Sequence, residues 1–272
     1  MSDPSRYEAR ILAQRARRDH RLTTNPLNWF SLVGLFKLDE GDNPIGEGGK
    51  IQLATLPGGF HARFHLAGRD VRLLDAPGGD VTVNGNPPAD RPLRLDVDKS
   101  PDLIEAGSLA MRLILRGEKI YLRVWDRASA ALKDFNGLKY FPVDAAYRIP
   151  ARYTLFETPH LSEIWDVLGT RHETVFAGTA SFSLRGVACS LLAQEDGDNL
   201  LFSFTDETRV DASYPGGRYI ECQKPRGNKL TLDFNLAVNW PCAYTDYATC
   251  PLPPMENRLP VRVEAGEIRY HS

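Results

Sequence analysis

The sequence lacks long apolar runs, and it lacks the short motifs by which several enzyme classes are known. No run of about 18 apolar residues is present, and the first residues do not form the apolar stretch of a secretory signal. We therefore expect a cytoplasmic protein that makes no contact with a membrane. Neither a phosphate-binding G-x-G-x-x-G nor the G-x-S-x-G of serine hydrolases occurs, so no nucleotide or other cofactor is expected.

An excess of charge of one sign is also missing. The 33 Lys and Arg residues are balanced by 35 Asp and Glu residues, which leaves a net charge of −2. Nucleic acid or an anionic membrane would favour a basic surface, so neither partner is expected. The 42% hydrophobic and 25% charged residues are typical of a globular protein, and 272 residues suffice for two domains. None of these features indicates the oligomeric state.

Cysteine is scarce, and no histidine occurs between His172 and His271. The four cysteines are Cys189, Cys222, Cys242 and Cys250. In a cytoplasmic protein we expect them to be free thiols. Zinc would need two further ligands beside Cys242 and Cys250, and the spacing supplies none, so no metal site is expected. We interpret this pair as buried small hydrophobes, with a disulfide as the alternative in an oxidising compartment.

The chain begins with a predicted helix. Residues 4–22 are rich in Arg, Ala and Glu and contain no Gly, and Asn25-Pro26 then ends the helical pattern. We interpret the six arginines of this segment as a solvated face rather than a basic arm, because Glu8 and Asp19 interrupt the positive charge. Residues 1–28 are assigned to this helix and a linker.

Residues 29–126 carry short apolar runs between turn residues, which is typical of an all-β unit. The candidate strands are Trp29–Leu38, Ile51–Ala54, Phe60–Leu66, Val71–Leu74, Val81–Val83, Leu109–Leu115 and Ile120–Trp125. Tight turns are expected at Gly48-Gly49, Gly58-Gly59, Gly78-Gly79 and Asn84-Gly85. This pattern predicts a small antiparallel sandwich.

A second β unit is predicted after an ordered connector at residues 127–158. Residues 159–272 repeat the pattern of short apolar runs, with turns at Arg185-Gly186 and Pro225–Asn228. We expect an antiparallel barrel or sandwich, closed or nearly closed by a last strand at Val261–Glu264. The predicted fold class is therefore mainly β with an N-terminal helix.

A long proline-rich loop interrupts this second unit. Its prolines are Pro241, Pro251, Pro253, Pro254 and Pro260. Such a segment forms neither a helix interior nor a central strand, while its aromatic residues require a core to pack against. We therefore predict an ordered loop that forms one wall of a pocket.

Residues in and near this loop could bind a small polar ligand, which is the function we predict. The candidate ligand-binding residues are Asp206, Tyr214, Arg218, Asp233, Asn235, Asn239, Trp240, Cys242, Tyr244, Cys250 and Asn257. Amides, phenols and a guanidinium can orient polar groups, with Trp240 supplying apolar surface. The structural alternative is that Asp206 pairs with Arg218 and that the amides satisfy backbone groups of the loop.

Two other functions stay open at this point. A hydrolase could use the same pocket, with Asp206 or Asp233 as the base or Cys242 as the nucleophile, so the sequence does not decide whether the protein is an enzyme. A protein-interaction scaffold would instead use the N-terminal sandwich, and it would require a large exposed apolar patch there.

The N-terminal half resembles a forkhead-associated sandwich. The motifs that carry the resemblance are Asn43-Pro44-Ile45-Gly46, His61-Ala62 and Val83-Asn84-Gly85. Domains of that kind bind phosphothreonine through an Arg and a Ser, whose positions here hold Glu47 and Gly58. The resemblance implies a shared fold, but a carboxylate would repel a phosphate, so a phosphopeptide partner is not expected.

The C-terminal half resembles the family known as domain of unknown function 1684. The motifs are Phe204-Thr205-Asp206, Tyr214-Pro215-Gly216-Gly217-Arg218, Asp233-Phe234-Asn235, Pro241-Cys242-Ala243-Tyr244, Cys250-Pro251-Leu252-Pro253-Pro254 and Glu264-Ala265-Gly266-Glu267. With Gly34-Leu35-Phe36 and Tyr140–Val143 the resemblance covers nearly the whole chain, and we expect a bacterial-type protein. It implies no particular activity, since the function of the family is itself unknown.

Overall fold

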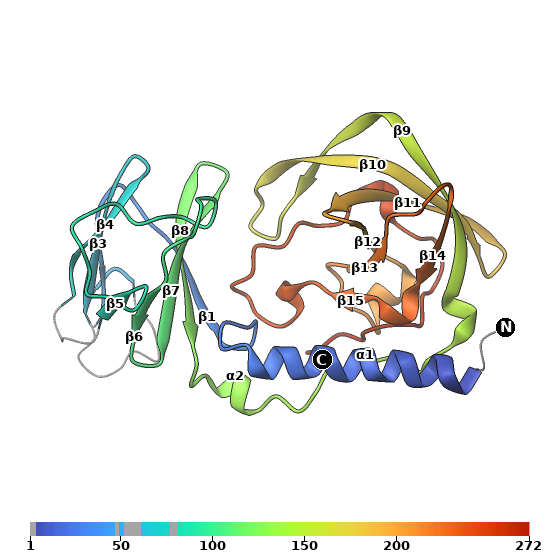
Figure 1. Ribbon diagram of the computed structural model, residues 1–272, viewed down its shortest axis with the longest axis horizontal. Coiled ribbons are helices and arrows are strands. Elements are labelled where there is room, and N and C mark those ends of the chain that lie inside the picture. Colours follow the sequence, from blue (N-terminus) through green and yellow to red (C-terminus); the bar gives the residue numbers. More distant parts are fainter. Residues whose placement is uncertain (1–3, 47–48, 52–60, 77–80, 272) are drawn as a thin grey trace. The chain divides into compact units, whose positions relative to one another are not determined.

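The computed structural model describes residues 4–46, 49–51, 61–76 and 81–271, and the chain divides into two compact units. The middle unit contains Leu22–Phe135, and the C-terminal unit combines Met1–Arg21 with Asn136–Ser272. Both are built on antiparallel sheets. The predicted fold class, mainly β with an N-terminal helix, is confirmed (Figure 1).

The middle unit contains a five-stranded and a three-stranded sheet. The first has the order β1 (Leu32–Lys37), β8 (Lys119–Asp126), β7 (Leu109–Arg116), β6 (Ile104–Ala106) and β5 (Val81–Val83), and the second has the order β2 (Gly41–Ile45), β3 (Ala62–Ala67) and β4 (Asp70–Asp75). Alternate residues of β3 are buried, as the period of a half-buried strand requires. Aliphatic side chains from both sheets form one core.

Turn chemistry is confirmed where the structure describes it. Asn84 and Gly85 have φ angles of 53° and 75°, as a tight turn after β5 requires. The predicted turns at Gly58-Gly59 and Gly78-Gly79 lie outside the described residues, as does Gly48.

The C-terminal unit contains helix α1 (Pro4–Thr24) up to Arg21 and a seven-stranded sheet. The sheet has the order β14 (Lys229–Asp233), β9 (Arg148–Trp165), β10 (Arg171–Leu184), β11 (Val187–Asp196), β12 (Asn199–Phe204), β13 (Arg218–Gln223) and β15 (Val238–Asn239). Strands β9 and β10 form a long hairpin (Figure 1). Strand β10 turns into β11 through Arg185 and Gly186, whose φ angles of 51° and 82° fit the predicted turn.

The structure differs from the sequence prediction in three places. The segment predicted as a connector, residues 127–158, contains the short helix α2 (Ala130–Lys133) and the beginning of β9. Strand β9 is continuous where the sequence pattern predicts separate strands at Tyr153–Glu157 and Ile164–Leu168, because a register shift opposite Phe176–Gly178 accommodates the extra residues. No strand forms at Val261–Glu264. In the described part of the chain, β14 and β15 therefore remain the outer strands of an open sheet.

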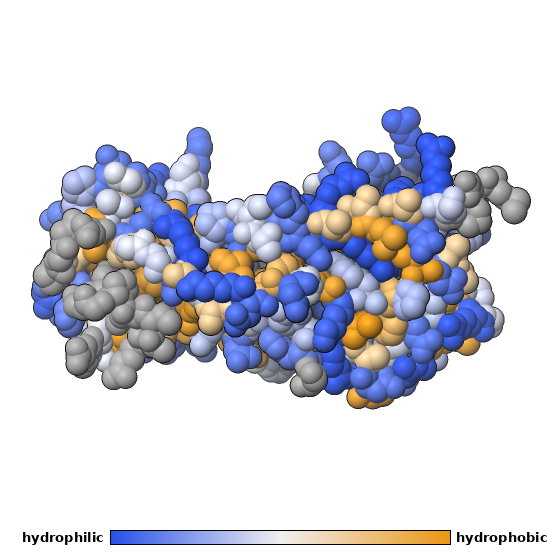
Figure 2. Space-filling model, turned by 90° about the horizontal axis from the view of Figure 1, so that it is seen from below, coloured by the Kyte–Doolittle hydropathy of each residue, from blue (hydrophilic) through white to orange (hydrophobic). Residues whose placement is uncertain are grey.

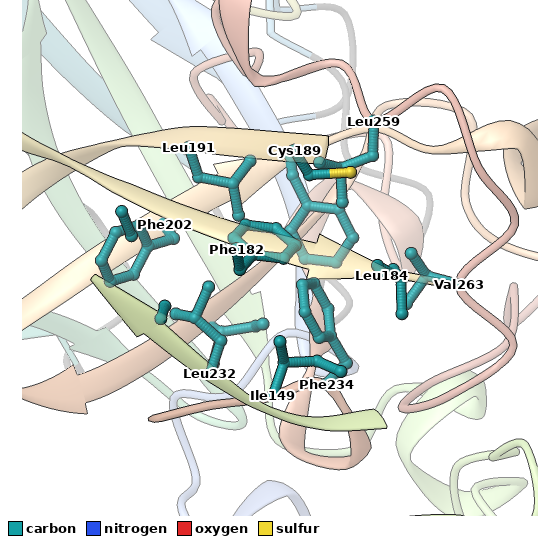
Figure 3. Close-up of a cluster of buried hydrophobic side chains, with 14 of the residues drawn as sticks. Ile149, Phe182, Leu184, Cys189, Leu191, Phe202, Leu232, Phe234, Leu259 and Val263 are labelled. Carbon is teal, nitrogen blue, oxygen red and sulfur yellow. The ribbon is translucent and has the colours of Figure 1, made fainter. Parts of the chain in front are cut away.

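The core of the C-terminal unit joins strands to the irregular C-terminal segment. Phe182 packs against Phe234, with ring centroids 5.8 Å apart. Leu259, near the C-terminal end of the proline-rich loop, and Val263, which follows the loop, reach the same cluster (Figure 3). The loop is thus anchored in the core at its far end, as its apolar content predicts.

No described helix has the length and apolar character needed to cross a membrane. On the face shown in Figure 2, hydrophobic patches are small and are interrupted by hydrophilic side chains.

Candidate functional site

One side of helix α1 faces the interior of the C-terminal unit. Tyr7, Ile11 and Arg15 are buried, and Arg18 is part-buried. The intervals of four, four and three residues place these side chains on one helical stripe. The interpretation of the helical arginines as a solvated face is therefore wrong for Arg15 and Arg18.

Arg18 is the centre of a buried polar group that we name the Arg18 cluster: Arg18, Tyr219, Tyr244 and Glu267. Arg18 Nε donates to Glu267, and its Nη2 donates to the Tyr244 hydroxyl at 3.1 Å. Tyr244 also donates to Glu267, and Tyr219 lies close enough to Arg18 for this charge to oppose the rise in the pKa of Tyr219 that burial causes. Four segments that are remote in sequence thus meet at one guanidinium.

Burial and charge set the electrostatics of this cluster. Glu267 is 0% exposed, and its second oxygen also accepts the backbone N–H of Asn239 at 2.8 Å. Burial and the negative charge of Glu267 raise the pKa of Tyr244 well above its ordinary value. Burial, the largest single effect, lowers the pKa of Arg18, but Glu267, Tyr244 and Tyr219 together outweigh it, so this pKa is raised. The cluster is therefore a charged pair surrounded by neutral phenols.

Gly266, the residue before Glu267, allows the chain to pass close to the backbone of Ala237. Gly266 has a φ of 79°, and a Cβ atom there would lie 2.5 Å from the carbonyl oxygen of Ala237. Glycine is thus required by both conformation and space.

An aromatic pair flanks the Arg18 cluster. Trp240 packs on Tyr219 with ring centroids 4.4 Å apart, and both side chains are part-exposed. Within the described residues, the buried Trp240 Nε1 has no hydrogen-bond partner. On the neighbouring turn of α1, Arg15 lies over the Tyr140 ring at 4.5 Å and donates to the carbonyl oxygen of Phe141.

Arg218, predicted as a ligand-binding residue, is 1% exposed and forms part of a second network. It donates to Asp206 at 2.8 Å and to the carbonyl oxygens of Val263 and Ala265. Asp206 also accepts from the backbone of Thr208 and of Val263. The structural alternative, a pair between Asp206 and Arg218 that holds the loop, is the arrangement observed.

Asp233 and Asn235 fasten helix α1. The Tyr7 hydroxyl donates to Asp233 at 2.8 Å, and Asn235 donates to that hydroxyl at 2.9 Å. Burial, reinforced by the charge of Asp233, raises the pKa of Tyr7. Arg10 adds a more exposed ion pair to Asp233 at 3.3 Å.

Asn239 and Asn257 satisfy backbone groups of irregular segments, as the structural alternative for the amides predicts. Asn257 accepts the N–H of Leu192 at 2.6 Å and donates to the carbonyl oxygens of Leu192 and Ser203. Asn239 donates to the carbonyl oxygen of Ile268 at 2.8 Å. Both amides are buried.

Three other candidates form a separate group. Cys242 and Cys250 are free thiols, and the backbone N–H of Cys242 donates to Cys250 Sγ at 3.2 Å. Tyr214 interacts with Cys242, and this interaction adds to burial in raising the pKa of Tyr214. The predicted site is therefore divided among several networks, and among its residues Arg218, Asn239, Trp240 and Tyr244 touch or adjoin the Arg18 cluster.

Sequence reasoning missed Arg15, Arg18 and Tyr219. The spacing of Arg15 and Arg18 from Ile11 was the available signal, but charged helical residues are ordinarily solvated. It also missed the contact of His172 with the buried Asp166 at 2.7 Å. Asp166 caps the turn between β9 and β10 by accepting from the backbone of Leu168 and Thr170.

No group of three or more His, Cys, Asp or Glu residues is placed to hold a metal ion within residues 4–46, 49–51, 61–76 and 81–271.

The fold and the site thus describe a mainly β protein whose C-terminal unit carries buried ionic networks. Residues 133–268, half of the chain, match the family described as "Protein of unknown function (DUF1684)". The chain belongs to this family.

The solved structures that resemble the chain include an uncharacterized protein of Haloarcula marismortui determined by solution NMR. It is 38% identical over 50% of this chain and 78% of that chain, with a TM-score of 0.42. No curated protein gives a significant match.

Proposed function

We propose that the C-terminal unit binds a small ligand rich in oxygen acceptors at the part-exposed edge of the Arg18 cluster. The observation that carries the proposal is the meeting of Arg18, Tyr219 and Trp240 at a place where each side chain keeps some exposure. The planar guanidinium of Arg18, beside the packed rings of Tyr219 and Trp240, can orient a small molecule with few hydrogen bonds.

Two polar groups beside the Arg18 cluster lack a hydrogen-bond partner among the described residues, the donor Trp240 Nε1 and the acceptor Asn239 Oδ1. Glu267 already accepts from Arg18, Tyr244 and the backbone. The Tyr219 ring is part-exposed and packs on Trp240. A carboxylate or carbonyl group fits the indole N–H of Trp240.

A hydrolase that uses Asp206 or Asp233 as its base is less well supported. A general base must reach the proton that it removes. Asp206 is 2% exposed and bound to Arg218 and two backbone amides, and Asp233 is bound to Tyr7 and Asn235. We therefore favour binding over hydrolysis by these carboxylates.

The interaction scaffold is also less well supported. It requires an apolar patch on the middle unit, but Leu74 and Val97 are the only large apolar side chains exposed among that unit's described residues. The forkhead-associated resemblance stays a prediction, and Glu47 and Gly58 lie outside the described residues. We expect no binding of phosphothreonine peptides, which fluorescence polarisation would measure.

Thermal-shift titration with small carboxylates and amides tests the proposed site. Trp240→Phe keeps a ring on Tyr219 but removes the indole N–H, so we expect affinity for a hit to fall by about 3–10-fold, the contribution of one hydrogen bond. Trp165→Phe is the matched control, because Trp165 is 47% exposed on β9 in the same unit. Equal responses of the wild type and the Trp240 variant to every hit would contradict the proposal.

A further inference from the structure

Cys242 and Cys250 are held close together by structure on both sides of the loop that joins them. Cys242 lies in a short 3-10 helix, Pro241–Ala243. Cys250 is fixed to the β9–β10 hairpin, because its carbonyl oxygen accepts from the N–H of Val167 at 3.0 Å. The backbone N–H of Cys242 then reaches Cys250 Sγ at 3.2 Å. The approach of the two side chains is thus set by the fold.

The two thiols differ in their surroundings. Cys242 is part-exposed, whereas Cys250 is 5% exposed. Interactions with the Cys250 thiol and with the Tyr214 hydroxyl favour the thiolate form of Cys242. A part-exposed cysteine whose thiolate is favoured is suited to attack, and a covered cysteine beside it is suited to the second step.

The other two cysteines provide an internal comparison. The hydrogen bond from Cys250 lowers the pKa of Cys242, although burial opposes this effect. Burial raises the pKa of Cys222 to about 11 and also raises the pKa of Cys189. At neutral pH the thiolate population should therefore be largest at Cys242.

We propose that Cys242 and Cys250 form a reversible redox site that reacts with hydroperoxides, with Cys242 as the attacking thiol and Cys250 as the resolving thiol. The Cys242 thiolate attacks one peroxide oxygen, the O–O bond breaks, and hydroxide or alkoxide leaves and takes a proton from solvent. Cys242 is then a sulfenic acid. Cys250 attacks its sulfur, the S–O bond breaks, water leaves, and a disulfide forms. The two thiols supply the two electrons that reduce the peroxide.

This proposal does not depend on the ligand proposed above. The full chain is treated with hydrogen peroxide, and the cysteines are mapped by alkylation and mass spectrometry. We expect a Cys242–Cys250 disulfide that a dithiol reverses, with Cys189 and Cys222 still reduced. Before oxidation, Cys242 should alkylate at least about tenfold faster than Cys222 at neutral pH.

Variants separate the two steps. Cys250→Ser should stop the reaction at a sulfenic acid on Cys242, which dimedone labels. Tyr214→Phe should slow the oxidation several-fold, and Cys222→Ser should leave it unchanged. Equal alkylation of Cys242 and Cys222 in the wild type would overturn the proposal, as would a disulfide between any other pair or overoxidation of Cys242 without disulfide formation.

Discussion

Each unit buries an aspartate that is held by arginine, but the two arrangements differ in their exposure to water. In the middle unit, Asp102 is 1% exposed and binds Arg91 and Arg94, whose side chains are 41% and 44% exposed. In the C-terminal unit, Asp206 and Arg218 are 2% and 1% exposed. In the middle unit the arginines that bind the buried aspartate thus lie at the surface, whereas in the C-terminal unit both partners lie in the core.

The difference follows from how each unit satisfies its backbone. In the middle unit, Asp102 accepts the backbone N–H of Arg94 at 2.8 Å, in the irregular segment between β5 and β6. The C-terminal unit ends in a segment with few strand pairs, so buried side chains must bind its carbonyl and amide groups. Arg218 alone donates to the carbonyl oxygens of Val263, Ala265 and Glu267. Ionic side chains in this core therefore form the hydrogen bonds to carbonyl groups that a neighbouring strand would otherwise form.

Arg218→Met should have the largest effect. Methionine preserves much of the volume but leaves Asp206 as a buried, uncompensated charge and removes partners from three carbonyl groups. We expect a loss of about 3–5 kcal/mol in the free energy of unfolding, measured by urea denaturation. Arg91→Met is the control in the middle unit, and an equal loss there would remove the distinction between the units.

Asn257→Asp should have the next largest effect. The substitution is isosteric, but it places a carboxylate oxygen against the carbonyl oxygens of Leu192 and Ser203, to which the amide donates at 3.0 and 2.7 Å. We expect a loss of about 2–3 kcal/mol and faster hydrogen exchange in the proline-rich loop. Asn136→Asp, at an exposed position of the same unit, should change neither quantity.

The structural roles of the amides and of Arg218 could be predicted from the sequence as alternatives to ligand binding. A proline-rich segment cannot pair its backbone in a ladder, so the alternative to ligand binding was that the amides satisfy backbone groups of the loop, and Asn257 does so. The alternative for Arg218 was a pair with Asp206, which is observed. The burial of Arg15 and Arg18 could not be predicted from the sequence. Arg18 is separated from Glu267 by 249 positions, and no local pattern joins them.

The strand boundaries show the same limit. Thr158-Pro159 resembles a break between two strands, yet β9 continues through it. The register shift opposite Phe176 and Gly178 that allows this is a property of the paired strand. Local sequence therefore predicted the fold class and the turns, whereas pairing between distant segments determined where strands end.

Asp102→Asn should reduce the free energy of unfolding by a smaller amount, and this reduction should depend on pH. Burial alone would raise the pKa of Asp102, but hydrogen bonds from Arg91 and Arg94 outweigh it and hold this pKa well below its usual range. Because the folded-state pKa is depressed, the stabilisation is present above the unfolded pKa of about 3.9 and is lost as pH falls through the folded value.

We expect a loss of about 1–2 kcal/mol at pH 7, since both arginines are solvent-screened. The difference from the wild type should shrink as the pH is lowered below about 4. Urea denaturation at several pH values measures both quantities. A constant difference across this range would show that Asp102 acts through shape rather than charge.

Arg171→Ala should have the smallest effect and completes the series from core to surface. Arg171 and Glu163 form an ion pair at 3.3 Å on the β9–β10 hairpin, with side chains 60% and 67% exposed, and Arg171 also lies over the Trp165 ring. Exposed pairs of this kind contribute about 0–1 kcal/mol, so the urea midpoint should hardly move. A loss of unfolding free energy as large as that of Arg218→Met would mean that burial does not determine how much these arginines contribute to stability. The contrast between core and surface ion pairs would then be wrong.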